Sequence, residues 1–211
     1  MRPATSPGNH PPAPSLVGDV IDRTFGHPRG LLGRLGGTVM AHAHAAIERH
    51  VVDVAKLARE ESVLVVGPGP GVGLAEAAAR ARRVVGVDPS ADMLDVCRHR
   101  CADAVAAGAV VLRQATAEAT GEPDAAADVV LSVNNVHLWD DRHAAFAELY
   151  RVLCPGGRLV LSAHERWLPV SRHALAAQLE RAGFTDLQTW AWDPPGPLAG
   201  RAAQLRAWRP R

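Results

Sequence analysis

Residues 62–78 read SVLVVGPGPGVGLAEAA, so that an apolar run leads into four alternating glycines and then into an alanine-rich stretch. A continuous β-branched run is typical of a strand covered on both faces, whereas alanine and leucine favour a helix. Glycines at a strand-to-helix turn let the backbone approach a ligand closely, and the first turn of the helix offers unpaired N–H groups. The stretch therefore predicts a strand, a ligand-binding loop and a helix.

The same alternation continues along the chain. Apolar runs predict strands at 62–66, 83–87, 109–113, 128–132, 158–162, 185–190 and 204–208, and helices are predicted at 71–81, 91–107, 141–153 and 171–182. Since only DPPGPLAG separates the last two strands, these two should pair antiparallel through a loop. The prediction is a doubly wound, Rossmann-like α/β sheet of seven strands, mostly parallel with an antiparallel last strand, and with helices on both faces.

Length and composition limit the class of protein. The 211 residues are 47% hydrophobic and 21% charged, as in an ordinary globular protein, and no apolar run reaches the ~18 residues of a membrane helix. With a net charge of +1, the protein has no overall positive potential that would attract nucleic acid. We therefore expect a cytoplasmic protein, monomeric or homodimeric, without membrane span or nucleic-acid partner. The three cysteines, Cys97, Cys101 and Cys154, are expected to be reduced thiols, because their spacing suits neither disulfides nor zinc.

The region before the first strand divides into two parts. Residues 1–25 are expected to be a disordered proline-rich tail, and 26–61 a glycine-rich segment followed by a helix that covers the site. Residues 62–211 would then form the cofactor-binding domain. His42, His44 and His50 lack companion carboxylates or thiols at ligand spacing, so surface histidines are favoured over a metal site.

The glycine loop does not follow the dinucleotide pattern G-x-G-x-x-G in any register, but it does contain G-x-G-x-G at Gly67, Gly69 and Gly71. The second predicted strand ends at Asp88, 21 positions after Gly67. A carboxylate at this strand end can accept hydrogen bonds from both hydroxyls of a ribose. The ligand predicted at this edge of the sheet therefore contains a nucleoside.

The chain resembles the class I S-adenosylmethionine-dependent methyltransferases, in particular the small-molecule (type 11-like) group. The resemblance rests on VLVVGPGPGVGL, VVGVDPSADML, ADVVLSVNNVHLWDD and RVLCPGGRLVLS, in this order, and spans residues 38–209. It implies S-adenosylmethionine as cofactor and a small-molecule acceptor; Trp139 and the apolar N-terminal segment suggest an aromatic or quinone-like one. The cofactor-binding residues that it implies are Gly67, Pro68, Gly69, Gly71, Asp88, Pro89, Met93, Thr116, Ala117, Glu118, Ser132, Val133 and Asn134.

Three qualifications accompany this resemblance. Thr116 stands where the family commonly has an aspartate that contacts the adenine amino group, so the hydroxyl of Thr116 or the neighbouring Glu118 would have to replace it. The Pro155-Gly156-Gly157 turn before the fifth strand is expected to be structural. A catalytically silent cofactor-binding protein remains an alternative, as does a nicotinamide-dependent reductase, although the sole tyrosine and the sole lysine, Tyr150 and Lys56, form no Tyr-x-x-x-Lys pair.

The residues that contact the methyl acceptor are expected just beyond the fourth and fifth predicted strands. His137 is the candidate catalytic base and a candidate substrate contact, and Trp139 and His164 are further substrate contacts. By analogy with the family, the N-terminal segment would cover the acceptor, with Leu31, Leu35 and Met40 contacting it. Metal is not required, because displacement from a sulfonium mainly needs alignment of the reacting atoms.

Overall fold

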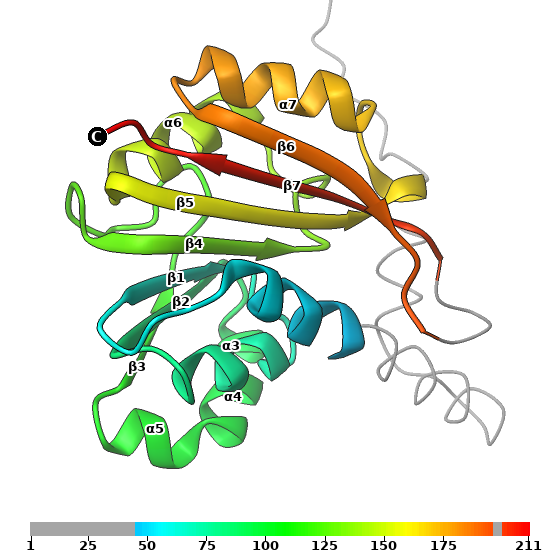
Figure 1. The fold of residues 1–211 in the computed structure, drawn as a ribbon. Coiled ribbons are helices and arrows are strands. Elements are labelled where there is room, and N and C mark those ends of the chain that lie inside the picture. Colours follow the sequence, from blue (N-terminus) through cyan, green and yellow to red (C-terminus); the bar gives the residue numbers. More distant parts are fainter. Residues whose placement is uncertain (1–44, 196–199) are drawn as a thin grey trace, which may run out of the picture. The chain divides into compact units, whose positions relative to one another are not determined.

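The computed structural model describes residues 45–195 and 200–211. These residues form one sheet with the strand order β3-β2-β1-β4-β5-β7-β6 (Figure 1). The strands are β1 (Ser62–Val66), β2 (Arg83–Asp88), β3 (Val110–Gln114), β4 (Ala127–Val133), β5 (Leu153–His164), β6 (Thr185–Trp192) and β7 (Ala202–Trp208). The first five pair in parallel, and β7 is antiparallel to both β5 and β6. The predicted seven-stranded, mostly parallel sheet with an antiparallel last strand is confirmed.

The helices lie close to their predicted positions, with one correction. They are α3 (Val72–Ala78), α4 (Ala91–Arg100), α5 (Ala102–Ala106), α6 (Arg142–Val152), α7 (Arg172–Arg181) and the short 3-10 helix η1 (Glu165–Trp167). The single helix predicted at 91–107 is wrong, because the backbone of Cys101 leaves the helical region at φ −106° and ψ 26°. The break keeps the Cys101 side chain buried while α5 contacts β3.

Alternate residues of the five parallel strands face two separate cores. Leu64 and Val66 of β1 point into a cluster with Phe146 and Leu149 of α6. Val63 and Val65 point the other way, into a cluster built with residues of 45–55 and of α3 and α4. Since side chains alternate along a strand, a sheet whose residues are buried in both directions must carry helices on both faces, as predicted.

The core extends to the N-terminal side of the predicted domain start at Ser62. Residues 45–55 are helical, and Val51, Val52 and Ala55 are buried in the second cluster. Arg158 of β5 fixes the end of this helix, since its Nε donates to the carbonyl of Ala55 at 2.8 Å. The predicted tail 1–25 and the glycine-rich part of 26–61 lie outside the described residues.

The Pro155-Gly156-Gly157 segment is not a separate turn ahead of β5 but a bulge inside it. The register between β4 and β5 shifts in this region, and Gly156 has a φ of 82°. A Cβ on Gly157 would lie 2.8 Å from the carbonyl oxygen of Cys154 and 2.9 Å from that of Asp128. Backbones approach so closely here that only glycine fits at this position, so the segment is structural as predicted but lies within β5 and not before it.

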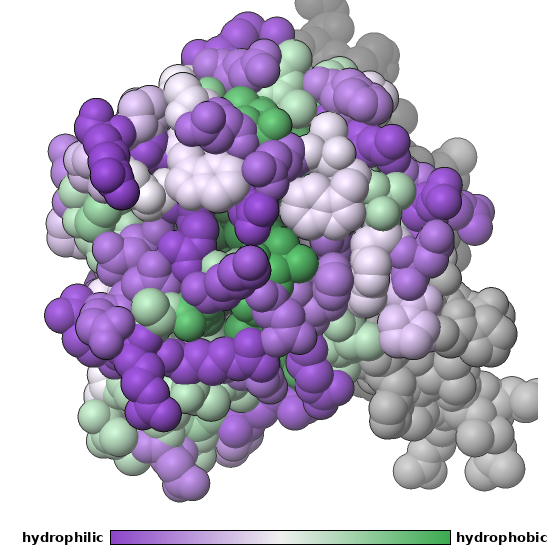
Figure 2. Space-filling model, viewed as in Figure 1, coloured by the Kyte–Doolittle hydropathy of each residue, from purple (hydrophilic) through white to green (hydrophobic). Residues whose placement is uncertain are grey.

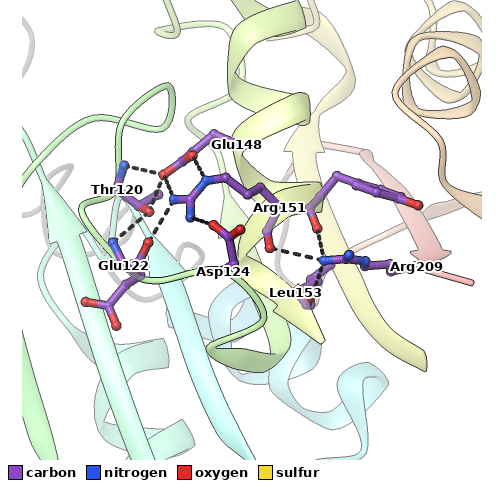
Figure 3. A network of polar contacts seen from close by, with 8 residues as sticks. Thr120, Glu122, Asp124, Glu148, Arg151, Leu153 and Arg209 are labelled. Carbon is purple, nitrogen blue, oxygen red and sulfur yellow. Dashed lines mark hydrogen bonds and ion pairs between the residues drawn. The ribbon is translucent and has the colours of Figure 1, made fainter. Parts of the chain in front are cut away.

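A polar network ties the elements together at the amino ends of the parallel strands (Figure 3). The Arg151 guanidinium donates to Glu148 at 2.7 and 2.8 Å and also bonds Asp124. Both the backbone N–H and the hydroxyl of Thr120 donate to the same Glu148 carboxylate. This network joins the loop before β4 to α6 and lies at the edge opposite the glycine loop, so we assign it to stability.

The surface seen in Figure 2 is mostly hydrophilic, with a smaller apolar area near the centre of this face. Among the helices that the structure describes, none is long and apolar enough to cross a membrane.

Candidate functional site

The topology places a candidate binding site between the carboxyl ends of β1 and β4. From β1 the chain continues to β2 and β3 on one side of the sheet, and β4 and β5 then extend the sheet on the other side of β1. Adjacent loops diverge at such a switch point, which leaves a crevice where ligands of open α/β sheets bind. The glycine loop follows β1 at this point, and residues 134–141 follow β4.

The glycine loop is held in a conformation that other residues rarely adopt. Gly67, Gly69 and Gly71 have φ values of 60°, 52° and 82°. The N–H of Gly67 donates to the carbonyl of Val87 at 2.8 Å, which ties the loop to the end of β2. A Cβ on Gly67 would lie 2.2 Å from Nδ2 of Asn135. Gly67 is therefore required both by its backbone conformation and by lack of space.

Asn135 is a site residue that the sequence reasoning missed. Its amide is buried between the ends of β4 and β1, where Nδ2 donates to the carbonyl of Val66 and Oδ1 accepts from the Ser132 hydroxyl at 2.5 Å. The predicted neighbour Asn134 has a left-handed φ of 54° and accepts from the His164 N–H at 2.8 Å. The Asn-Asn pair directly after a buried strand is the signal in the sequence, and the structure gives the buried contact to its second member.

Asp88 lies at the end of β2, as predicted, and is 9% exposed. Burial raises the pKa of its carboxyl, and the Ser90 N–H, which donates to Oδ1 at 2.9 Å, partly opposes this shift. The described residues give Oδ2 no hydrogen bond. A carboxylate with one oxygen held by the backbone and the other unpaired suits the neighbouring hydroxyls of a ribose.

The residues predicted around the adenine come together at the ends of β2 and β3. The side-chain amide of Gln114 donates to the carbonyl of Pro89 at 3.0 Å, which holds these two ends side by side. Ala117 is buried, Met93 and Glu118 are half-buried, and Thr116 is exposed. Glu118 accepts from the Asp141 N–H at 3.3 Å, so this carboxylate is partly committed to the loop after β4.

Glu48 is the second missed residue, and it comes from the helix at 45–55. Its Oε2 accepts from the N–H of Gly73 at 2.6 Å. Burial raises the pKa of the Glu48 carboxyl to about 7, against the backbone hydrogen bond from Gly73 and the charges of Arg100 and Arg49. The signal was present in the sequence, because Glu48 is a single acid among the apolar residues Ile47, Val51 and Val52 of a helix face.

Cys97 of α4 packs against the glycine loop. Its side chain is fully buried, and the thiol donates to the carbonyl of Gly69 at 3.1 Å. Burial raises the pKa of this thiol to about 12, so it remains protonated and unreactive. All three cysteines are free in the structure, as expected.

Three of the predicted acceptor residues lie in the described part beyond β4 and β5. The His137 ring packs against Trp167 with 5.6 Å between centroids, and the His164 ring lies 5.0 Å from the same tryptophan. Nδ1 of His137 is buried without a partner among the described residues. Trp139 is 9% exposed and packs edge-on against Phe146, so most of its ring belongs to the core.

The remaining predicted contacts and the predicted surface histidines differ in what the structure describes of them. Met40, Leu31, Leu35, His42 and His44 lie outside the described residues. His50 is half-buried and not a free surface histidine, because its ring stacks on Trp192 at 3.7 Å and its Nε2 lies 3.2 Å from Oε1 of Gln204. Within residues 45–195 and 200–211, no group of three potential metal ligands comes together.

Comparisons with known proteins agree with this architecture. Residues 64–161 match the model of the family described as a methyltransferase domain. The uncharacterized methyltransferase YdaC of Bacillus subtilis (strain 168) is 28% identical over 162 residues, covering 72% of this chain and 87% of that protein. The YcgJ protein of Bacillus subtilis superposes with a TM-score of 0.66 at 16% identity, covering 81% of this chain and 99% of that structure.

A further structural neighbour carries ligands. The phosphoethanolamine N-methyltransferase 2 of Haemonchus contortus, solved with S-adenosylhomocysteine and phosphomonomethylethanolamine, has a TM-score of 0.67 at 16% identity, covering 78% of this chain and 52% of that structure. Residues 64–161 are thus similar to a methyltransferase domain, and the fold is shared with solved methyltransferases; both findings support an S-adenosylmethionine-dependent methyltransferase enzyme.

Proposed function

We propose that this enzyme transfers a methyl group from S-adenosylmethionine to a small molecule, and that the crevice beside β1, β2 and β4 holds the cofactor. The observation that carries the assignment is the left-handed glycine loop next to the buried Asp88, whose Oδ2 has no hydrogen bond from the described residues. A glycine backbone and an acceptor-only carboxylate are the groups that a nucleoside with a free ribose diol requires.

Each predicted residue has a place in this assignment. Asp88 would accept hydrogen bonds from the two ribose hydroxyls, while the glycine loop would follow the methionine end. The residues that would border the remaining cofactor are Pro68, Pro89, Met93, Thr116, Ala117, Glu118, Ser132, Val133 and Asn134. Since the Ser132 hydroxyl is fully buried and already donates to Asn135, it would act by positioning the loop and not by direct contact.

The bound sulfonium supplies an activated methyl group, so the protein mainly aligns the acceptor with it. The His137–Trp167–His164 group offers one aromatic ring and two imidazoles beyond the ends of β4 and β5. Burial lowers the pKa of His137, which keeps the imidazole neutral near pH 7. We infer an aromatic or quinone-like acceptor whose hydroxyl proton is accepted by His137, with the exposed edge of Trp139 beside it.

The cofactor assignment predicts a large effect of Asp88→Asn. The variant keeps an oxygen that can accept from the Ser90 N–H but loses the charge, so the affinity for S-adenosylhomocysteine should fall roughly 10- to 100-fold with the fold intact. Calorimetric titration measures this affinity. Asp92→Asn, which removes an exposed carboxylate in the first turn of α4, is the matched control and should bind as the wild type does. Equal affinities of the two variants would remove Asp88 from the site.

The acceptor assignment predicts that His137→Gln lowers the turnover number about 100-fold on a hydroxylated acceptor and changes KM little. The wild-type rate should fall as pH drops through the lowered pKa of His137, because the protonated imidazole cannot accept a proton. Production of S-adenosylhomocysteine with a panel of phenols, enols and amines is the measurement. His143→Gln, on the exposed side of α6, is the control. If no panel member is methylated while the cofactor still binds, the result would favour a catalytically silent cofactor-binding protein.

Titration with NADH tests the remaining alternative. Tight binding of NADH together with no response to S-adenosylmethionine or S-adenosylhomocysteine would replace the methyltransferase with a nicotinamide-dependent enzyme. We expect the opposite pattern, because the loop has no G-x-G-x-x-G register.

A further inference from the structure

Glu48 places a carboxyl group next to the glycine loop. This residue lies outside the matched methyltransferase domain, which begins at residue 64. Glu48 is 9% exposed, and its Oε2 holds the Gly73 N–H at 2.6 Å. A Cβ on Gly69 would lie 3.9 Å from Oε1, so the second oxygen faces the glycine loop. The ion pairs among the described residues do not include Glu48. A buried carboxylate without a cation is costly, and such groups are usually paired or functional.

A small cavity lies beside this carboxylate. It has a volume of about 10 Å³, and Glu48, Gly67, Pro68, Gly73 and Val133 contribute to its lining. The remaining lining residues are apolar: Val51, Val52, Val65 and Leu131. The space admits one water-sized group, which is also the size of an ammonium group. Because the other walls are valine, leucine, proline and glycine, Glu48 supplies the only side-chain charge of this lining.

The charged groups around Glu48 leave this position open to a cation. Arg49 lies on the same helix and points into solvent, and Arg100 of α4 is exposed with its Nε donating to the carbonyl of Pro70 at 2.7 Å. The Cys97 thiol, also of α4, is protonated and adds no charge. Both arginines act on Glu48 only through space and do not pair with it.

Resting on the proposed function, we infer that Glu48 is the counter-ion of the cofactor's α-ammonium group and thereby selects ligands that carry the amino-acid end. The carboxylate lies between the glycine loop and the end of β4, where the methionine end of the cofactor would follow the loop. An ion pair formed in a cavity of low polarity is stronger than one in water, and Gly73 keeps the carboxylate aimed at the loop.

The test is a comparison of two ligands against Glu48→Gln. S-Adenosylhomocysteine carries the ammonium group, whereas methylthioadenosine has the same nucleoside and sulfur but lacks the amino-acid end. Glutamine keeps an oxygen for the Gly73 N–H, so the loop should retain its shape. We expect calorimetry to give a loss of roughly tenfold or more for S-adenosylhomocysteine and less than about twofold for methylthioadenosine.

The matched control is Asp53→Asn, which removes an exposed carboxylate from the same helix, and it should change neither affinity. In the wild type, binding of S-adenosylhomocysteine should also strengthen from about pH 6 to 8, as Glu48 loses its proton, and this slope should be absent in Glu48→Gln. Equal losses for both ligands would make Glu48 a support of the loop and overturn the inference, as would no loss for either ligand. A wild-type protein that binds neither ligand would contradict the proposed function itself.

Discussion

Gly67→Ala should destabilise the protein by about 2 to 5 kcal/mol and abolish cofactor binding. The left-handed backbone at φ 60° costs an alanine about 1–2 kcal/mol. The new methyl group would also lie 2.2 Å from Nδ2 of Asn135. Moving that amide breaks its hydrogen bonds to the Val66 carbonyl and the Ser132 hydroxyl inside the core, at about 1–3 kcal/mol for buried groups left unpaired. Urea denaturation gives the change in free energy of unfolding.

Gly108→Ala is a matched control for the backbone cost alone. Gly108 has a φ of 72°, and an added Cβ would have no heavy atom within 4 Å. This variant should therefore lose only about 1–2 kcal/mol and bind S-adenosylhomocysteine normally. If Gly67→Ala loses no more than Gly108→Ala, Asn135 moves aside freely and does not constrain the loop. The double variant Gly67→Ala/Asn135→Ala should recover space but not the lost hydrogen bonds.

The ligand-free protein should become less stable as pH rises, because of Glu48. Burial raises the pKa of Glu48 from 4.5 to about 7 in the folded protein. Below pH 4.5 the carboxyl is protonated in both states, and its contribution to stability is fully present. Between these values the unfolded chain releases the proton first, so the contribution is lost as pH rises through 7. The linkage amounts to about 3 kcal/mol, taking ~1.4 kcal/mol for each pKa unit.

Urea denaturation of the wild type and of Glu48→Gln at pH values from about 5 to 8 isolates this contribution. The difference between the two proteins should change across the range, with the glutamine variant gaining relative stability at high pH. Glu60→Gln, which removes an exposed carboxylate outside the core, is the matched surface control. Parallel curves for all three proteins would show that Glu48 is solvated in the folded state. A residue that weakens the free enzyme and strengthens cofactor binding would be an example of function retained at a cost in stability.

Strong local patterns explain why most of the architecture was predictable. The first five strands are continuous apolar runs, because a parallel sheet is covered on both faces, and two-sided burial is visible in the residues themselves. The antiparallel end of the sheet was predictable because no helix is encoded between the last two strands. The helix broken at Cys101 and the bulge at Gly157 were not predictable in the same way, since each depends on what packs against the segment.

The sequence by itself determined the sheet, the glycine loop and Asp88, because each is encoded within a few consecutive residues whose backbone preferences and polarity act locally. Only the tertiary structure decided the roles of Asn135 and Glu48. Asn135 holds a carbonyl 69 positions away and Glu48 an N–H 25 positions away, so neither contact leaves a periodic trace in the chain. Burial then changes their chemistry, since a carboxylate that would be an ordinary surface charge in water becomes a group that binds or releases a proton near pH 7.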